Sequence, residues 1–269
     1  MRYLPLFLLS ILLFSCDPPV KEVPSPQSLD YKIDTIQKQA KLDSGEVYFE
    51  FFIENIRLKG EKDSLLGAIE DSIQKHLLTA NINFAAEVHS YQALFDSISA
   101  EYQRLLKSDY PPYSPWDLSQ SLRVVHNGNG VFSYESTHGA YTGGAHPNRF
   151  SQSQFIRLKD GRDLPLDSLV IPGKMSDLLD LGEQLFRNEN QISELAPLND
   201  AGFWFDDNQF RFPENFTMDS LGLHFHYNAY DIAPYAMGHF FVDIPDKYLS
   251  EFIKPQYLLT PKTPEIPES

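Results

Sequence analysis

The sequence is poor in cysteine, in positive charge and in long apolar segments. Cys16 is the only cysteine among 269 residues, so the chain cannot form an internal disulfide and must be stabilised by burial of a core. Lysine and arginine number 22 against 37 aspartates and glutamates, and the net charge is −15. That charge argues against nucleic acid and against electrostatic adhesion to anionic lipid surfaces. It suits a cationic partner, although such a charge is more commonly that of a soluble surface that binds nothing.

Catalytic signatures are lacking as well. The sequence contains no Gly-x-Ser-x-Gly, no His-Glu-x-x-His and no glycine-rich phosphate loop. The acidic stretch 206–208 lacks the spaced oxygen ligands of a calcium loop and is interpreted as a turn. We therefore expect no cofactor, and no catalytic residue is assigned. With 42% hydrophobic and 13% aromatic residues, the chain can nevertheless bury a sizeable core.

The N-terminus carries the exceptional apolar run. Arg2 precedes apolar residues over 3–14, a run too short to span a bilayer and typical of the hydrophobic region of an export signal. The stretch 13–16, Leu-Phe-Ser-Cys, resembles the lipobox of bacterial lipoproteins, which implies that Cys16 is the lipidated first residue of the mature protein. An ordinary cleaved signal with a chance cysteine is the alternative. Loss of residues 1–16 removes Arg2 alone among charged residues and leaves a net charge of −16.

Proline-rich stretches divide the rest of the chain. Four prolines in the twelve residues after Cys16 predict a semi-extended spacer, and the C-terminal end is a similar loose tail. The predicted division is a lipoprotein signal peptide at 1–16, a proline-rich linker at 17–41, an N-terminal domain at 42–152, a C-terminal domain at 153–254 and a tail at 255–269.

Hydrophobic periodicity predicts helices early and strands later. Apolar residues recur at steps of three and four over 84–105, which indicates one long helix, and a second stripe over 65–77 follows a cap at Asp63 or Ser64. Asn-Gly-Asn-Gly at 127–130 predicts a hairpin. We expect an α+β fold in which long helices pack on an antiparallel sheet and two adjoining small domains share one compact unit. The other expected elements are strands at 46–58, 148–158, 204–212, 221–227 and 238–244 and helices at 175–188 and 248–253.

Two segments resemble one known family. The first, 141–170, contains Tyr-Thr-Gly-Gly-Ala-His-Pro-Asn, and the second, 216–249, contains Tyr-Asp-Ile-Ala-Pro-Tyr-Ala-Met-Gly. They resemble a pair of extracytoplasmic domains of unknown function. Such domains occur beside bacterial peptidoglycan deacetylase modules and in the ectodomains of lysozyme-sensing anti-sigma factors. The resemblance assigns the deacetylase-associated type to 42–152 and the anti-sigma-ectodomain type to 153–254.

The chain also departs from both kinds of relative. It has no room for a separate catalytic module, and it begins with an export signal where the anti-sigma factors carry a cytoplasmic segment and a transmembrane helix. The resemblance therefore implies a stand-alone, lipid-anchored copy of the accessory or sensing module. It implies neither deacetylation nor control of a sigma factor.

The turn motif 141–148 is the first candidate site. Gly143 and Gly144 can adopt positive φ and allow another backbone to approach, and Pro147 biases His146 towards an extended conformation. His146 is thus expected on a rigid turn between strands. That position suits a ligand contact or a structural hydrogen bond to a neighbouring loop, and the pattern alone favours the structural role. A catalytic base would need an oriented partner, which the sequence does not name.

His224 and His226 form the second candidate site. They lie two apart on an expected strand and share one face, so a third ligand would complete a metal site. His138, His146 or His239 could supply it, and no spacing rule selects among them. The alternative is two polar residues on the solvent face of a strand. The opposite face of that strand carries Leu223, Phe225 and Tyr227.

The aromatic loop 227–238 is the third candidate. Tyrosines alternating with polar side chains suit stacking on sugars or contact with a protein partner, while Pro234 and Gly238 are equally typical of a connecting loop. The residues expected to bind a ligand are His146, Asn148, Tyr227, Asn228, Tyr230, Asp231 and Tyr235.

The sequence favours a non-catalytic module of the bacterial cell envelope that binds a protein or a glycan, either related to peptidoglycan or resembling lysozyme. It would be exported and held at a membrane by its N-terminal lipid alone, facing the periplasm or the cell surface, with no nucleic-acid partner. The first alternative is a peptidoglycan hydrolase or deacetylase that uses His146, with a metal at His224 and His226. The second is a purely structural envelope lipoprotein.

Overall fold

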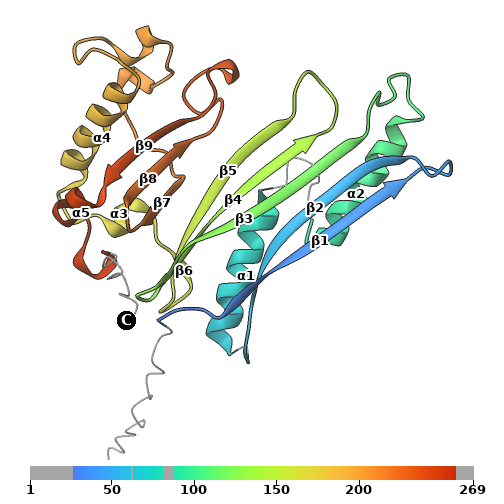
Figure 1. Cartoon of the computed structure of the whole chain (residues 1–269), viewed down its shortest axis with the longest axis horizontal. Coiled ribbons are helices and arrows are strands. Elements are labelled where there is room, and N and C mark those ends of the chain that lie inside the picture. The colour runs from blue at the N-terminus through green and yellow to red at the C-terminus, as the bar shows by residue number, and fades with distance from the viewer. Residues whose placement is uncertain (1–26, 62, 81–87, 259–269) are drawn as a thin grey trace, which may run out of the picture.

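The computed structural model describes residues 27–61, 63–80 and 88–258 and shows a mixed α+β fold with two sheets (Figure 1). The predicted signal peptide, Cys16 included, lies outside these residues, as does most of the predicted tail. The strands are β1 (Tyr31–Lys41), β2 (Val47–Leu58), β3 (Trp116–Gly128), β4 (Val131–Tyr141), β5 (Asn148–Arg157), β6 (Arg162–Asp163), β7 (Phe216–Asp219), β8 (Gly222–Tyr227) and β9 (Phe240–Pro245). The helices are α1 (Ser64–Thr79), α2 (Tyr91–Leu105), α3 (Leu166–Leu169), α4 (Met175–Glu189) and α5 (Asp246–Phe252).

The larger sheet has six strands in the order β1-β2-β3-β4-β5-β6. Strands β3, β4 and β5 form an antiparallel meander, and the predicted Asn-Gly hairpin joins β3 to β4. Strands β2 and β3, however, pair in parallel, with Phe49 opposite Trp116. The predicted antiparallel sheet is therefore wrong at this pair. The intervening chain contains both α1 and α2, the long crossover that a parallel pair requires.

Strand β1 corrects the predicted linker. Tyr31–Lys41, assigned to the linker at 17–41, form the edge strand of the large sheet and pair antiparallel with β2. Most of their side chains are exposed or half-buried, which explains why hydrophobic periodicity did not reveal a strand. The boundary predicted between residues 152 and 153 falls inside β5.

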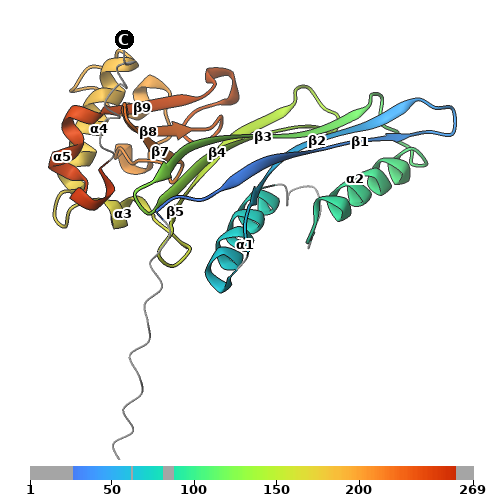
Figure 2. The ribbon, with the colours of Figure 1, turned by 60° about the horizontal axis from the view of Figure 1, so that its bottom comes forward.

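Helices α1 and α2 cover one face of the large sheet (Figure 2). Asp63 caps α1 by accepting from the amides of Leu65 and Leu66, as predicted, and the apolar stripe of the helix is buried against the sheet. Helix α2 begins at Tyr91, capped by Ser90. It is thus shorter than the helix predicted over 84–105, of which residues 84–87 lie outside the described part. Within the described residues, α1, with 16 residues, is the longest helix, and none is long and apolar enough to cross a membrane.

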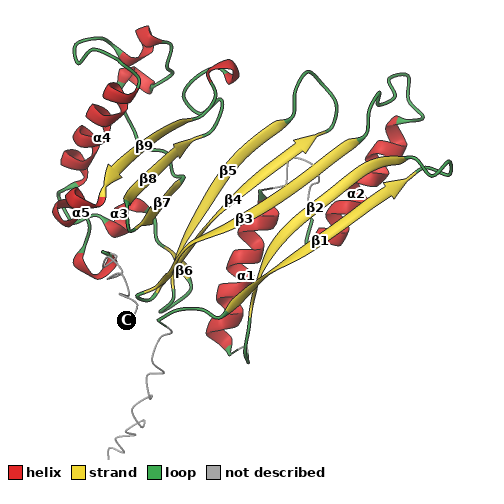
Figure 3. Ribbon diagram, in the orientation of Figure 1, coloured by secondary structure: helices red, strands yellow, loops and turns green. Residues whose placement is uncertain are grey.

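The smaller sheet has the order β7-β8-β9 and is covered by α4 and α5 (Figure 3). The strand predicted over 204–212 is wrong: this segment contains a 3-10 turn at Asp206–Asn208, with Asp207 and Asn208 at positive φ. Its apolar residues are frequent because Phe205 and Phe210 enter the core around Phe186. Strand β7 packs against β3, β4 and β5, which brings the two sheets together.

Candidate functional site

The turn motif forms an exposed loop between β4 and β5. Strand β4 ends at Tyr141 and β5 begins at Asn148. Gly143 and Gly144 have φ of +96° and +107°, values that L side chains rarely adopt. A Cβ built on either glycine would have no neighbour within 4 Å. The glycines therefore allow the positive φ values that the loop requires. No other backbone approaches them closely in the described part of the chain.

Two tyrosines hold this loop from one side. The amide of Gly144 donates to the hydroxyl of Tyr113 at 3.1 Å. The carbonyl oxygen of Gly144 lies 2.8 Å from that hydroxyl and 3.1 Å from the hydroxyl of Tyr141. The two hydroxyls are 2.8 Å apart, and this hydrogen bond raises the pKa of Tyr141 above its ordinary value. Tyr113 thus fixes the loop, although no sequence signal singled it out.

On the other side, His146 stacks on Tyr235. The ring centroids are 3.9 Å apart and the planes differ by 14°. The Tyr235 hydroxyl donates to the Pro147 carbonyl at 3.3 Å, and His146 Nδ1 lies 3.1 Å from the same oxygen. Tyr235 belongs to a short 3-10 turn, η4 (Tyr235–Met237). The two motifs that were distant in the sequence therefore meet in one surface cluster.

Tyr230 extends this cluster. Its ring centroid lies 5.6 Å from that of Tyr235, and 58% of its surface is exposed. Its φ of +75° is a conformation that costs about 1–3 kcal/mol for a residue with a side chain and that occurs often at functional sites. We call His146, Tyr235 and Tyr230 the aromatic row.

Asp231 shapes the turn that presents Tyr230. Its carboxylate accepts from the Asn228 amide at 2.7 Å, and its own amide donates to the Asn228 carbonyl at 3.0 Å. Asp231 is exposed beside the row. Asn148 is exposed as well and lies two residues after His146. Five of the seven predicted ligand contacts therefore gather at or next to the aromatic row.

The remaining two predicted contacts have structural roles. Tyr227 is fully buried, and its hydroxyl donates to the Arg211 carbonyl. Burial raises the pKa of Tyr227 well above its ordinary value. Tyr227 therefore has a packing role in the core, on the apolar face of β8.

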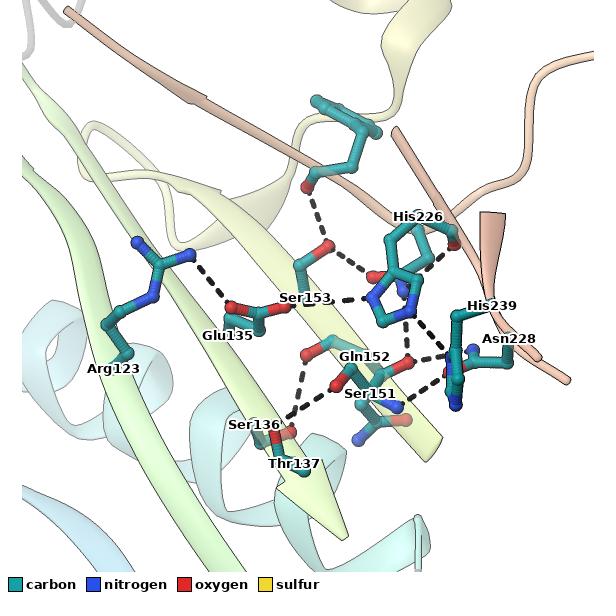
Figure 4. A network of polar contacts seen from close by, with 12 residues as sticks. Arg123, Glu135, Ser136, Thr137, Ser151, Gln152, Ser153, His226, Asn228 and His239 are labelled. Carbon is teal, nitrogen blue, oxygen red and sulfur yellow. Dashed lines mark hydrogen bonds and ion pairs between the residues drawn. The ribbon is translucent and has the colours of Figure 1, made fainter. Parts of the chain in front are cut away.

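Asn228 joins the two sheets (Figure 4). Its Oδ1 accepts from the Ser151 amide at 2.7 Å, and its Nδ2 donates to the Ser151 carbonyl at 2.9 Å. Asn215 Nδ2 donates to the same carbonyl at 3.0 Å, and Ser153 Oγ lies 2.6 Å from the Phe216 carbonyl. The side-chain amide of Asn228 therefore has a structural role, since both of its ends hydrogen-bond the backbone of Ser151 and link β5 to the small sheet.

The histidines of β8 have separate partners. His226 Nε2 lies 2.9 Å from His239 Nδ1, and its Nδ1 lies 3.8 Å from a carboxylate oxygen of Glu135 (Figure 4). The nearby His226 imidazole and the Arg123 guanidinium, which donates to Glu135 at 2.8 Å, hold the pKa of Glu135 below its usual range. His224 does not join this group. Glu135 was not anticipated, because its contact with His226 crosses from one sheet to the other.

The described residues do not group ligands for the metal site that was considered at His224 and His226. Within residues 27–61, 63–80 and 88–258, no three His, Cys, Asp or Glu side chains are grouped as a metal would require. Of the third ligands considered, His239 pairs with His226, while His146 stacks on Tyr235. His138 is buried, stacks on Phe150 and pairs with Ser136 at 2.9 Å, and burial lowers its pKa to about 4.

His224 lies between two carboxylates. Its Nδ1 is 2.7 Å from Asp243 and its Nε2 is 3.0 Å from Asp219. Burial alone would lower the pKa of His224, but the hydrogen bonds to Asp243 and Asp219 outweigh it and raise the pKa above the ordinary value. The register of the sheet pairs His224 with Asp243 directly, which explains this contact.

We expect His224 to stabilise the fold more in acid than in base. A pKa that is higher in the folded state gives stability that is fully present below the unfolded pKa, about 6.5, and is lost as the pH rises through the folded pKa. The difference in unfolding free energy between wild type and His224→Gln should therefore be largest near about pH 5.5, at most about 1 kcal/mol for such a half-exposed pair, and shrink by about pH 8. Urea unfolding at both pH values checks this, and a difference that grows with pH would contradict it.

Comparisons with known proteins match both halves of the chain. A model described as deacetylase PdaC matches residues 48–149, and a model of a protein of unknown function, DUF3298, matches residues 167–247. No curated protein matches the chain. The pairing expected from the two motifs is thereby confirmed.

Two solved structures share the fold. A DUF3298 family member from Bacteroides fragilis has a TM-score of 0.65 at 20% identity, covering 87% of this chain and 96% of its own. A DUF3298 family protein from Pseudomonas aeruginosa has a TM-score of 0.60 at 16% identity, covering 85% of this chain and 95% of its own.

Proposed function

We propose, from the premise that this chain joins a PdaC-type region to a DUF3298 region, that it is a non-catalytic module of the bacterial cell envelope that binds a glycan. The observation that supports the proposal is the aromatic row. His146 comes from the segment matched by the PdaC model, while Tyr230 and Tyr235 come from the segment matched by the DUF3298 model. The two regions therefore contribute to one exposed surface.

The chemistry of the row suits a sugar. Tyrosine and histidine rings offer flat apolar faces for the C–H face of a pyranose, together with polar edges that can hydrogen-bond its hydroxyls. Tyr113 and Tyr141 hold the glycine loop in place before any ligand arrives. A surface held in this way loses little conformational entropy on binding. The exposed Asn148 and Asp231 beside it can supply polar contacts.

An acid–base role for His146 has less support. General base catalysis requires a partner that orients the ring and a reacting group within reach. In the part of the chain that the structure describes, the contacts of the His146 ring are Tyr235 and the Pro147 carbonyl. Both contacts hold the His146 ring in position as part of a flat surface. We therefore assign His146 a binding role in place of the hydrolase or deacetylase role considered from the sequence.

We place the module outside the cytoplasm, held at a bacterial membrane by a lipid on Cys16. The N-terminal apolar run and the Leu-Phe-Ser-Cys stretch support this placement. Residues 17–26 would then be the spacer between the anchor and the first described residues. The segments around 48–149 and 167–247 would act as adjoining domains of this single tethered unit.

We expect the full chain to bind peptidoglycan oligosaccharides saturably and Tyr235→Ala to weaken that binding at least about tenfold. Removal of Tyr235 takes away a stacking face and also frees the His146 ring that rests on it; truncation of a central aromatic anchor typically costs about 2 kcal/mol or more. Isothermal titration calorimetry with muropeptides measures the affinity. Phe241→Ala is the matched control, because Phe241 is 52% exposed and lies outside the row.

The same titration includes lysozyme, a basic protein that the acidic chain would attract. Saturable binding to lysozyme without binding to muropeptides would move the assignment from glycan to protein. An unchanged affinity of Tyr235→Ala for muropeptides would remove the aromatic row from the proposal. Absence of binding to either probe would contradict the proposed function as a whole.

A further inference from the structure

A cavity of about 620 Å³ lies away from the aromatic row, where α1, β5, α4 and the segment before β7 meet. Its volume is within the range of about 300–1,000 Å³ that small-molecule sites occupy. His146, Tyr230 and Tyr235 do not line it. The main part of its wall is apolar: Phe155, Leu164, Met175, Leu179, Phe212 and Phe216.

The polar floor of the cavity presents acceptors. Gln154 is 6% exposed, and its Nε2 donates to Asp163 at 2.6 Å and to Ser72 at 3.2 Å. The Tyr134 hydroxyl donates to Gln154 Oε1 at 2.7 Å. The amide protons of Gln154 and the hydroxyl proton of Tyr134 are therefore already used within the protein.

His76 continues this chain of hydrogen bonds. Its Nδ1 lies 2.9 Å from the Tyr134 hydroxyl, whose single proton goes to Gln154. His76 Nδ1 must therefore carry the proton, which leaves Nε2 as an acceptor. Burial lowers the pKa of His76, against the opposing charge of Asp163. The ring is thus neutral at pH 7 and does not repel a cation.

The charges around the cavity all have one sign. Asp163, Asp167 and Glu214 are exposed residues that line it, and its lining includes no lysine or arginine. In the described part of the chain, none of these three carboxylates forms an ion pair. An apolar wall combined with acceptors and unpaired negative charge is complementary to a cation that carries an aliphatic stem.

We propose that this cavity binds an aliphatic primary ammonium group, as found on a lysine side chain or a free alkylamine. The methylene stem would lie against the apolar wall, and the ammonium would donate to Asp163, Asp167 or Glu214. This site is independent of the glycan proposal, since the two share no residue.

Titration of the full chain with n-hexylammonium chloride tests the proposal directly. We expect one saturable site and no comparable binding of hexanoate or hexanol, which share the stem and lack the cation. The double variant Asp167→Asn/Glu214→Gln should weaken hexylammonium binding at least about tenfold, because it removes two of the three charges. Asp163 is left intact because it accepts a hydrogen bond from buried Gln154. The matched control is Asp43→Asn/Asp109→Asn, which neutralises two exposed acids outside the cavity.

A second variant, Met175→Trp, should abolish binding by filling the cavity, with the thermal midpoint of unfolding confirming that the variant folds. Binding of an Nα-acetyl-lysine peptide alongside or instead of hexylammonium would identify a protein side chain as the source. Binding of the free amine alone would identify a small amine. Equal affinity for hexanol and hexylammonium, an unchanged affinity in the double variant, or no saturable binding of either amine would overturn the proposal.

Discussion

Phe186→Ala is expected to lower the free energy of unfolding by about 3–5 kcal/mol, the range for removal of a fully buried aromatic ring. Phe186 on α4 has no exposed surface. It lies at the centre of the core of the small sheet. The neighbouring residues cannot fill the cavity left by the substitution unless several rings move at once. Five aromatic rings have centroids 4.9–6.2 Å from the centroid of the Phe186 ring: Phe203, Phe205, Phe210, Tyr227 and Phe240.

Urea unfolding followed by tryptophan fluorescence measures this effect. Phe241→Ala removes the same ring from a site that is 52% exposed and should cost less than about 1 kcal/mol. A loss below about 1.5 kcal/mol for Phe186→Ala would show that the core can repack around the missing ring. Because natural domains are stable by only about 5–15 kcal/mol, the predicted loss is a large fraction of the total.

Exchange of residues 1–16 for an export signal that the ordinary signal peptidase cleaves is expected to move the protein almost completely from the membrane to the soluble fraction. An acyl chain contributes about 0.8 kcal/mol for each buried methylene group, and two or more chains give stable anchoring. The net charge of −16 on residues 17–269 opposes electrostatic adhesion to anionic lipids once the acyl chains are gone.

Detergent phase partitioning and the mass of the mature N-terminus provide the measurement. The natural chain should enter the detergent phase with lipid mass on Cys16, and the exchanged form, identical from residue 17 onward, should remain in the aqueous phase. An unmodified Cys16 in the natural chain would refute the anchor, whatever its distribution.

Local patterns predicted the elements whose contacts are local. The stripe on α1 follows from helical periodicity, and the β3–β4 hairpin follows from its Asn-Gly pairs. The sequence offered Asp63 or Ser64 as the cap of α1, and the structure selects Asp63. Burial of Tyr227 was visible in the alternation of β8, which places it on the same face as Leu223 and Phe225.

Contacts between distant segments were not predictable from those patterns. Nothing in the two motifs states that His146 stacks on Tyr235, or that Asn228 bonds the backbone of Ser151. Such pairs are set by how β7 docks against the large sheet. The role of Tyr113 was not predictable for the same reason, since it depends on a hydrogen bond to Gly144, which is remote in sequence. The two motifs are far apart in the sequence and meet on one surface only in the folded chain.

The parallel pair β2–β3 also has a consequence for the order of folding. The β1–β2 hairpin and the β3–β4–β5 meander each pair neighbours in the chain, whereas Phe49 must find Trp116 across two helices. Closing that long loop costs entropy before any contact repays it, and non-local pairing slows folding. The hairpin and the meander can form early on their own. The step that joins them then sets the rate at which a newly made chain completes its large sheet.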